Sequence, residues 1–282
     1  MKKLIYFMFP LGLLVQGAAA HADEDNWFPA GMTTDRIGTE TWAANLELAY
    51  NRFDDILFDE GTIMRLDLYG QYLAQVGAHR LGGYARVPVA RAFGTAGDQE
   101  IALGSPEVGG AFALAASPAT DLVFHGGLVL PTADDEDAFD IFLSSYGRLT
   151  DAFASLPDAT WLRLGGSVLH DAAPYFLRAD LGVDVPFSDD MDEGSLTEFD
   201  ALLRVNAAAG VDLGAAVLLG ELATVRVVGS ESDDEFLHTL ALTVRARGQT
   251  FSPSLGLVVP IGEMQTLLDF AIVAGVRIAD SN

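Results

Sequence analysis

The chain contains no cysteine. Neither disulfide bonds nor thiolate metal sites can therefore hold the fold or carry its chemistry. Long apolar runs are also missing after the N-terminal region, whereas a membrane-spanning helix needs about 18 or more consecutive apolar residues. We therefore do not expect a helical membrane protein.

Basic residues are few, with 16 Lys and Arg against 40 Asp and Glu and a net charge of −24. Such a surface repels phosphates, which argues against a nucleic-acid partner. The hydrophobic fraction is nevertheless 50%. These two properties are compatible if the acidic residues gather in loops and the apolar residues gather in strands.

The sequence carries no clear catalytic or metal-binding motif. His79, His125, His170 and His238 lack zinc-ligand spacing, and no G-x-S-x-G run occurs. The run "SDDMDEGSLTEFD" approaches a calcium-loop register, but Met191 occupies a ligand position, so we interpret the run as a solvated acidic loop. The sequence predicts no enzyme activity, no cofactor and no metal site.

The N-terminus has the organisation of a secretory signal peptide. Two lysines follow Met1, an apolar run extends from Leu4 to Val15, and the segment ends in Ala20-His21-Ala22. This order is typical of a signal peptide, and the apolar run is too short to span a bilayer. We predict a signal peptide over residues 1–22, a periplasmic N-terminal segment over 23–39 and a single barrel over 40–282.

The rest of the chain alternates polar and apolar residues with a period of two. Between residues 62 and 75, Met64, Leu66 and Leu68 share one face, whereas Arg65 and Asp67 share the other. A charged second face does not fit the core of a sandwich, but it fits a barrel with a polar lumen. About twelve strands are predicted, over residues 40–51, 62–75, 79–91, 104–117, 120–132, 159–171, 174–187, 197–212, 214–229, 235–248, 250–262 and 264–279.

The connections between these strands alternate in length and charge. Short links lie near residues 75–78, 117–119, 171–173, 212–214 and 248–250, and longer acid-rich loops such as "NRFDDILFDEG" from 51 lie between them. Outer-membrane barrels combine short periplasmic turns with long extracellular loops. The sequence therefore predicts an all-β fold, a single antiparallel up-and-down transmembrane β-barrel in a Gram-negative outer membrane. The long connection from 132 to 159 is expected to hold a short helix or an inward fold.

If the apolar face contacts lipid, the opposite face lines the lumen. The predicted lumen-lining residues are Glu47, Arg65, Asp67, Tyr69, Arg80, Arg86, Glu107, Arg163, Arg178, Asp180, Arg204, Arg245, Asp269 and Arg277. They form either a cationic stripe that attracts anionic solutes or arginine–carboxylate pairs that brace a narrow lumen, and we favour the pairs because acids accompany the arginines. One strand breaks the parity, since Glu221 and Arg226 fall on opposite faces. Either a β-bulge lies between them or Arg226 lies at the outer interface.

One hairpin resembles a known family. The run "GSPEVGGAFALAASPATDLVFHGGLVLPTA", from Gly104 to Ala133, is similar to outer-membrane proteins grouped as phenol-degradation or fatty-acid-type transport porins. Glu107-Val108-Gly109-Gly110 and Leu130-Pro131-Thr132 carry most of the resemblance. The resemblance implies a monomeric barrel that takes up small hydrophobic or aromatic molecules.

These observations lead us to expect an exported outer-membrane conduit that passes or binds small solutes without covalent chemistry. The expected partners are outer-membrane lipid, lipopolysaccharide, the barrel-assembly machinery and a small-molecule solute, and the oligomeric state is not predicted. Two alternatives stay open. One is a closed structural or adhesion barrel with acidic surface loops, and the other is a soluble periplasmic lipocalin-like binder that holds its apolar residues inside.

Overall fold

A computed structural model of the chain describes residues 36–53, 61–93, 101–132, 144–151, 160–187, 200–229, 236–248, 250–262, 265 and 268–280. The predicted signal peptide and the acidic runs quoted above lie mostly outside these residues. No helix within the described ranges is long and apolar enough to cross a membrane.

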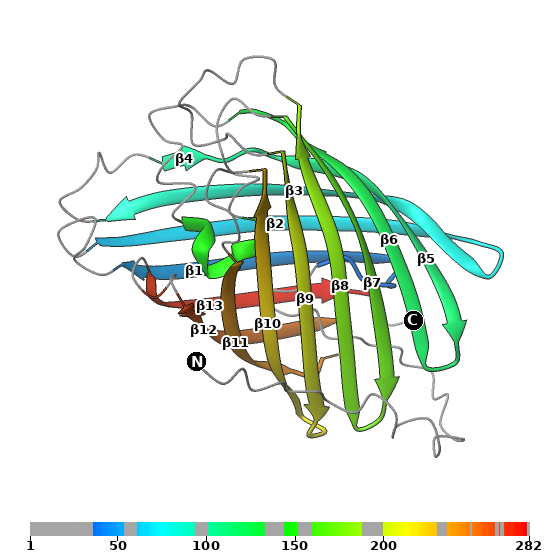
Figure 1. Cartoon of the computed structure of the whole chain (residues 1–282). Helices are drawn as coiled ribbons and strands as arrows, with labels where there is room; N and C mark the ends of the chain where they lie inside the picture. The colour runs from blue at the N-terminus through cyan, green and yellow to red at the C-terminus, as the bar shows by residue number, and fades with distance from the viewer. Residues whose placement is uncertain are drawn as a thin grey trace, which may run out of the picture.

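The described residues form one antiparallel sheet that closes on itself (Figure 1). Its strands are β1 (Trp42–Phe53), β2 (Gly61–Val76), β3 (His79–Phe93), β4 (Ile101–Leu103), β5 (Glu107–Ser117), β6 (Thr120–Val129), β7 (Trp161–Ala172), β8 (Tyr175–Pro186), β9 (Ala201–Asp212), β10 (Ala216–Val228), β11 (Phe236–Ala246), β12 (Phe251–Ile261) and β13 (Leu268–Ala279). Closure comes from β1, which pairs with both β2 and β13, while β3 pairs with β2 and β5. The three-residue β4 only extends the end of β3, so twelve long strands make the ring and the predicted barrel is confirmed.

The two faces of the strands have opposite polarity. On the outer face Leu46 is 45% exposed and Leu255 is 58% exposed, whereas on the inner face Glu47 is 5% exposed and Arg245 is 2% exposed. A soluble protein places its large apolar residues inside and leaves its charges in water. The reverse arrangement is what contact with lipid requires, and it does not fit the soluble lipocalin-like alternative.

Short turns connect the strands at one end of the barrel, which we call the short-turn end. The β2–β3 hairpin closes through Gly77 and Ala78, and Gly77 adopts a φ of 65°, a conformation that suits glycine in a tight hairpin. The β9–β10 connection likewise uses Gly214, at a φ of 86°. The opposite end, which we call the long-connection end, is where the described strands lead into the longer acidic connections.

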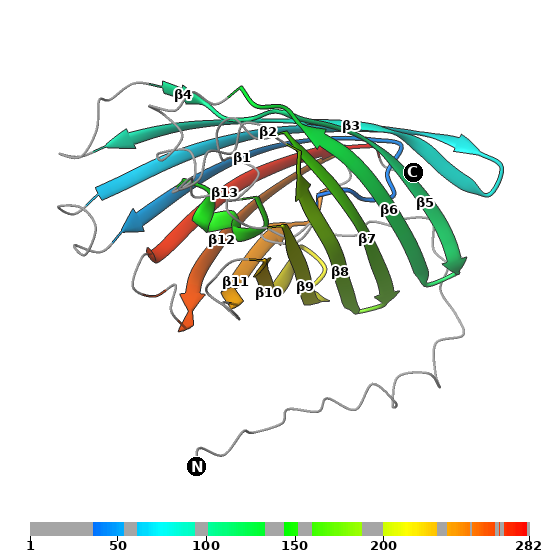
Figure 2. The same ribbon diagram turned by 45° about the horizontal axis from the view of Figure 1, so that its top comes forward.

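Two segments lie inside the barrel rather than in its wall (Figure 1; Figure 2). One is the 3-10 helix η1 (Ser145–Asp151), which confirms the short helix expected between residues 132 and 159. It contacts β1, β10, β11 and β13 and buries Leu149 completely. The other is the stretch 36–40, where Arg36 is 5% and Ile37 is 4% exposed, so part of the segment assigned to the periplasm lies in the barrel interior.

Candidate functional site

Most of the predicted lumen-lining residues lie on the inner face. Twelve of them are buried there: Glu47, Arg65, Asp67, Tyr69, Arg86, Glu107, Arg163, Arg178, Asp180, Arg204, Arg245 and Arg277. Arg80 is half-buried, and its guanidinium donates to the carbonyl of Thr39 inside the barrel. Asp269 lies elsewhere: its side chain is 38% exposed and 3.5 Å from Arg52 at the long-connection end. The pairing register shifts between Arg52 and Phe53, which breaks the simple alternation from which an inward position was predicted.

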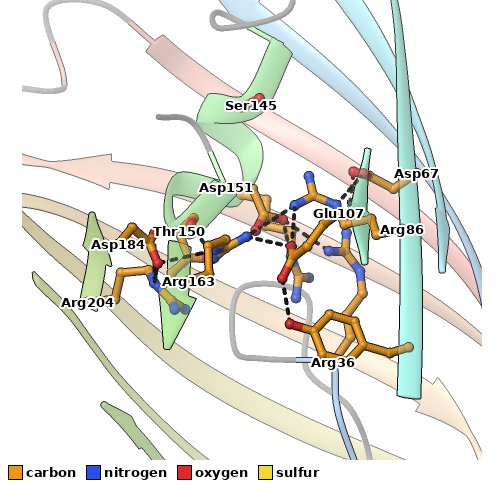
Figure 3. A network of polar contacts seen from close by, with 12 residues as sticks. Arg36, Asp67, Arg86, Glu107, Ser145, Thr150, Asp151, Arg163, Asp184 and Arg204 are labelled. Carbon is orange, nitrogen blue, oxygen red and sulfur yellow. Dashed lines mark hydrogen bonds and ion pairs between the residues drawn. The ribbon is translucent and has the colours of Figure 1, made fainter. Parts of the chain in front are cut away.

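The centre of the interior is the carboxylate of Asp151, at the end of η1. Arg86 lies 2.9 Å from it, Arg148 2.9 Å, and Arg36 and Arg163 3.0 Å each (Figure 3). These four arginines come from β3, η1, the N-terminal stretch and β7. One carboxylate therefore ties together two wall strands and both inserted segments.

Further carboxylates extend this network around the wall. Asp67 lies 2.8 Å from Arg65, 3.0 Å from Arg86 and 3.3 Å from Arg36. Asp184 bridges Arg163, at 3.3 Å, and Arg204, at 3.0 Å. The network thereby joins β2, β3, β7, β8 and β9 across the lumen (Figure 3).

Among the described residues, the buried charges of the interior nearly balance. The buried arginines are Arg36, Arg65, Arg86, Arg148, Arg163, Arg178, Arg204, Arg245 and Arg277, and the buried acids are Glu40, Glu47, Asp67, Glu107, Asp151, Asp180, Asp184 and Glu221. An uncompensated charge in such an environment is costly, so most of these groups are held in pairs. Burial alone would raise the pKa of Asp151, but Arg86, Arg36, Arg148 and Arg163 together hold it well below its usual range.

The described part of the chain has a cavity in the central network and another near the short-turn end. The first, of about 30 Å³, lies in the central network between Arg36, Tyr84, Arg86 and Asp151. A cavity needs about 10–15 Å³ to hold one water molecule, so this one has room for water but not for a larger solute. The second, of about 150 Å³, lies near the short-turn end and is lined by Thr39, Gln75, His79, Arg80 and Asp121, among others.

Glycines in the β5–β6 hairpin make room for an inward tyrosine. The Tyr84 hydroxyl donates to Glu107 at 2.7 Å. A methyl group at Gly109 would meet the Tyr84 ring, and one at Gly127 would overlap its hydroxyl. Close approach of the Tyr84 side chain therefore explains two glycines, Gly109 and Gly127, of the run that carries the family resemblance.

Three central residues are not among the predicted lumen residues: Arg36, Arg148 and Asp151. Strand parity does not apply to them, because they lie on inserted segments outside the strands. One sequence signal was available. Arg148 is a cation in a long connection that is otherwise rich in acids, and Asp151 follows three residues later.

β10, the strand in which Glu221 and Arg226 fall on opposite faces, has a regular pairing register. β10 pairs with β9 and β11 without a register shift, so the β-bulge considered between Glu221 and Arg226 is wrong. Glu221 is buried inside, whereas the Arg226 guanidinium stacks on the Phe236 ring at 5.1 Å near the long-connection end. The position of Arg226 agrees with the second alternative, an arginine at the outer interface.

Comparison with known proteins identifies the fold. No protein-family profile and no curated protein matches the sequence. An outer-membrane channel from Pseudomonas putida F1 shares the fold with a TM-score of 0.65 at 12% identity, over 89% of this chain and 99% of that one. The KdgM porin, solved in complex with disordered oligogalacturonate, and the NanC porin each give a TM-score of 0.50, at 8% and 7% identity, over 83% of this chain and 98% of theirs. This chain therefore has the fold of outer-membrane β-barrels, channels and porins among them.

Proposed function

We propose that this protein is a narrow outer-membrane channel for small solutes. The observation that carries the proposal is the polarity of the closed ring, which exposes leucines such as Leu242 (56%) and buries charges such as Arg65 (1%). An apolar outer surface suits a bilayer, and a polar interior suits a solute path. The shared fold with the channel from Pseudomonas putida F1 supports the same proposal.

We place the narrowest part of the proposed path where the two inserted segments meet. The N-terminal stretch leads into β1 from the short-turn end, whereas η1 enters from the long-connection end. They meet at the Arg36–Asp151 ion pair, at 3.0 Å. We place the periplasm at the short-turn end, because short turns face that compartment in barrels of this kind.

We propose small amphipathic or aromatic molecules as solutes. The hairpin from Gly104 to Ala133 resembles transport porins for small hydrophobic or aromatic molecules. An apolar cluster that includes Ile37, Tyr69, Leu73 and Tyr84 lies in the interior beside the charged network. A molecule with one apolar face and one polar group would find partners on both.

Planar-bilayer conductance of the full-length protein tests the proposal. We expect small, discrete steps from the wild type and larger steps from a variant in which the start of η1 is loosened, such as Asn51→Ala, described below. Liposome swelling with an aromatic alcohol and with a sugar of similar mass then tests the solute class. The channel proposal is abandoned if neither protein produces steps after its insertion has been verified.

A closed structural barrel is the second candidate. It is favoured by the central cavity of about 30 Å³ and by the ion pairs that surround it. A closed barrel predicts no steps from the wild type or from Asn51→Ala, so the same experiment separates the two functions.

A further inference from the structure

Arg245 differs from the other buried arginines of the described interior. Its side chain is on the inner face of β11 and 2% exposed, but its Nε and Nη1 atoms have no hydrogen-bond partner. No carboxylate of the described residues lies within 4.0 Å of its guanidinium, whereas each of the other eight buried arginines has at least one ion pair. Arg245 is thus a buried cation without a paired anion among the described residues.

The two residues paired with Arg245 are small: Val217 on β10 and Ser254 on β12. Ser254 lies directly opposite on β12, and its hydroxyl also has no partner. Directly paired residues of antiparallel strands have Cβ atoms about 4.5–5.5 Å apart, so the hydroxyl and the guanidinium are within reach of one small ligand. Gly275 on β13 and Gly256 on β12 lie next on the inner face and contribute no side chain. Ser252 on β12 and Thr243 on β11 also lie nearby, but their hydroxyls already donate to Gly248 and Glu221.

The nearby acids already have partners. Glu40 accepts from Arg277 at 2.6 Å, and Glu221 accepts from the Thr243 hydroxyl at 2.9 Å. A guanidinium does not lose its proton in proteins, so Arg245 cannot escape the cost of burial by becoming neutral. The described interior also holds nine buried arginines against eight buried carboxylates, which leaves one positive charge in excess.

We propose that Arg245 and Ser254 form a binding site for a small monovalent anion, either a halide or the carboxylate of an organic acid. A single excess positive charge matches one negative charge, and the unused N–H and O–H groups are the donors that such an anion requires. The site lies near the short-turn end of the lumen. Arg277 is on β13, two strands away from Arg245 on β11. The anion-site proposal is independent of the channel proposal, because a closed barrel would bind the same anion.

Thermal unfolding of the full-length protein in detergent micelles tests the site. Sodium bromide or sodium acetate is titrated at constant ionic strength against the sodium salt of a bulky sulfonate. For the wild type we expect a saturable rise in melting temperature. For Arg245→Gln we expect the apparent dissociation constant to weaken about tenfold or more, since a hydrogen bond to a charged group contributes roughly that much to affinity. Ser254→Ala should weaken it less.

Arg178→Gln is the matched control, because Arg178 is paired with Asp180 at 2.7 Å on the same inner surface. This variant should melt at a lower temperature but keep the anion response. A stronger response to acetate than to bromide assigns the site to carboxylates, and the reverse assigns it to halides. No saturable response in the wild type, or an equal response in Arg245→Gln, overturns the proposal. Should Arg245→Gln fail to fold, an anomalous bromide peak beside Arg245 in soaked wild-type crystals supports the site, and its absence overturns it.

Discussion

At the scale of single residues, the interior depends on a few groups with many partners. Asp151 faces four arginines at 2.9–3.0 Å, so its charge compensates several buried cations at once. Removal of one partner from a buried ion pair is strongly destabilising, because a buried charge is left without compensation.

Asp151→Asn should therefore lower the free energy of unfolding by about 3–5 kcal/mol. The measurement is a urea titration in detergent, followed by tryptophan fluorescence. Asp269→Asn is the control: its exposed pair with Arg52, at 3.5 Å, should contribute less than about 1 kcal/mol. Similar losses in the two variants would contradict a central role for Asp151.

A second residue-scale prediction concerns Gly127. A methyl group there would overlap the Tyr84 hydroxyl and displace it from Glu107, so Gly127→Ala should cost about 1–3 kcal/mol of stability. At Gly220, on the outer face, the nearest atom to an added methyl group is 4.0 Å away. Gly220→Ala should therefore be tolerated in the same urea titration, and equal effects would argue against the steric explanation.

At the scale of elements, Asn51 attaches the start of η1 to the wall, while the ion pairs of Asp151 with Arg86 and Arg163 hold its end. The Asn51 amide donates to the carbonyls of Ser144, at 2.9 Å, and Ile63, at 3.2 Å, and its oxygen accepts from the Gly147 amide at 3.1 Å. Asn51 thus joins β1 and β2 to both ends of the first turn of η1.

Asn51→Ala removes all three hydrogen bonds and should loosen the start of η1, whereas the ion pairs of Asp151 still hold its end. We expect a larger single-channel conductance and faster proteolysis within residues 144–151 than in the wild type. Asn206→Ala is the matched control, because the buried Asn206 amide has no hydrogen-bond partner in the described part of the chain. A conductance change of the same size in both variants would mean that η1 is not the constriction.

At the scale of the whole molecule, the charged interior makes stability depend on pH. The pKa of Asp151 is held well below its usual range in the folded state. A carboxyl with a depressed folded-state pKa contributes stability above its unfolded pKa, about 3.9, and this contribution is lost as the pH falls below that value.

The barrel should therefore keep nearly constant stability from neutral pH to about pH 5 and lose it progressively below about pH 4. Melting temperatures measured between pH 7 and pH 3 test this expectation. Asp151→Asn should have a shallower acid dependence than the wild type, because it lacks the group with the most arginine neighbours. An identical pH profile would contradict the assignment.

The strands themselves were predictable because alternation is a local property. Residues two positions apart share a face of any strand, so the outward Leu66 and the inward Arg65 and Asp67 follow from the printed sequence. Short and long connections, alternating along the chain, add the number of strands and their up-and-down order. Asp269 was misplaced because a register shift is decided by the neighbouring strand and not by the residues on either side.

The sequence by itself determined a closed, antiparallel barrel with an apolar exterior and an arginine-rich interior, since each of these features repeats within a few residues. Only the tertiary structure decided what fills that interior. Arg36 and Asp151 are separated by 115 positions, and no periodic pattern links them. Their meeting depends on how two irregular segments fold into a space that exists only after the ring has closed, and that same space leaves Arg245 without a paired carboxylate among the described residues.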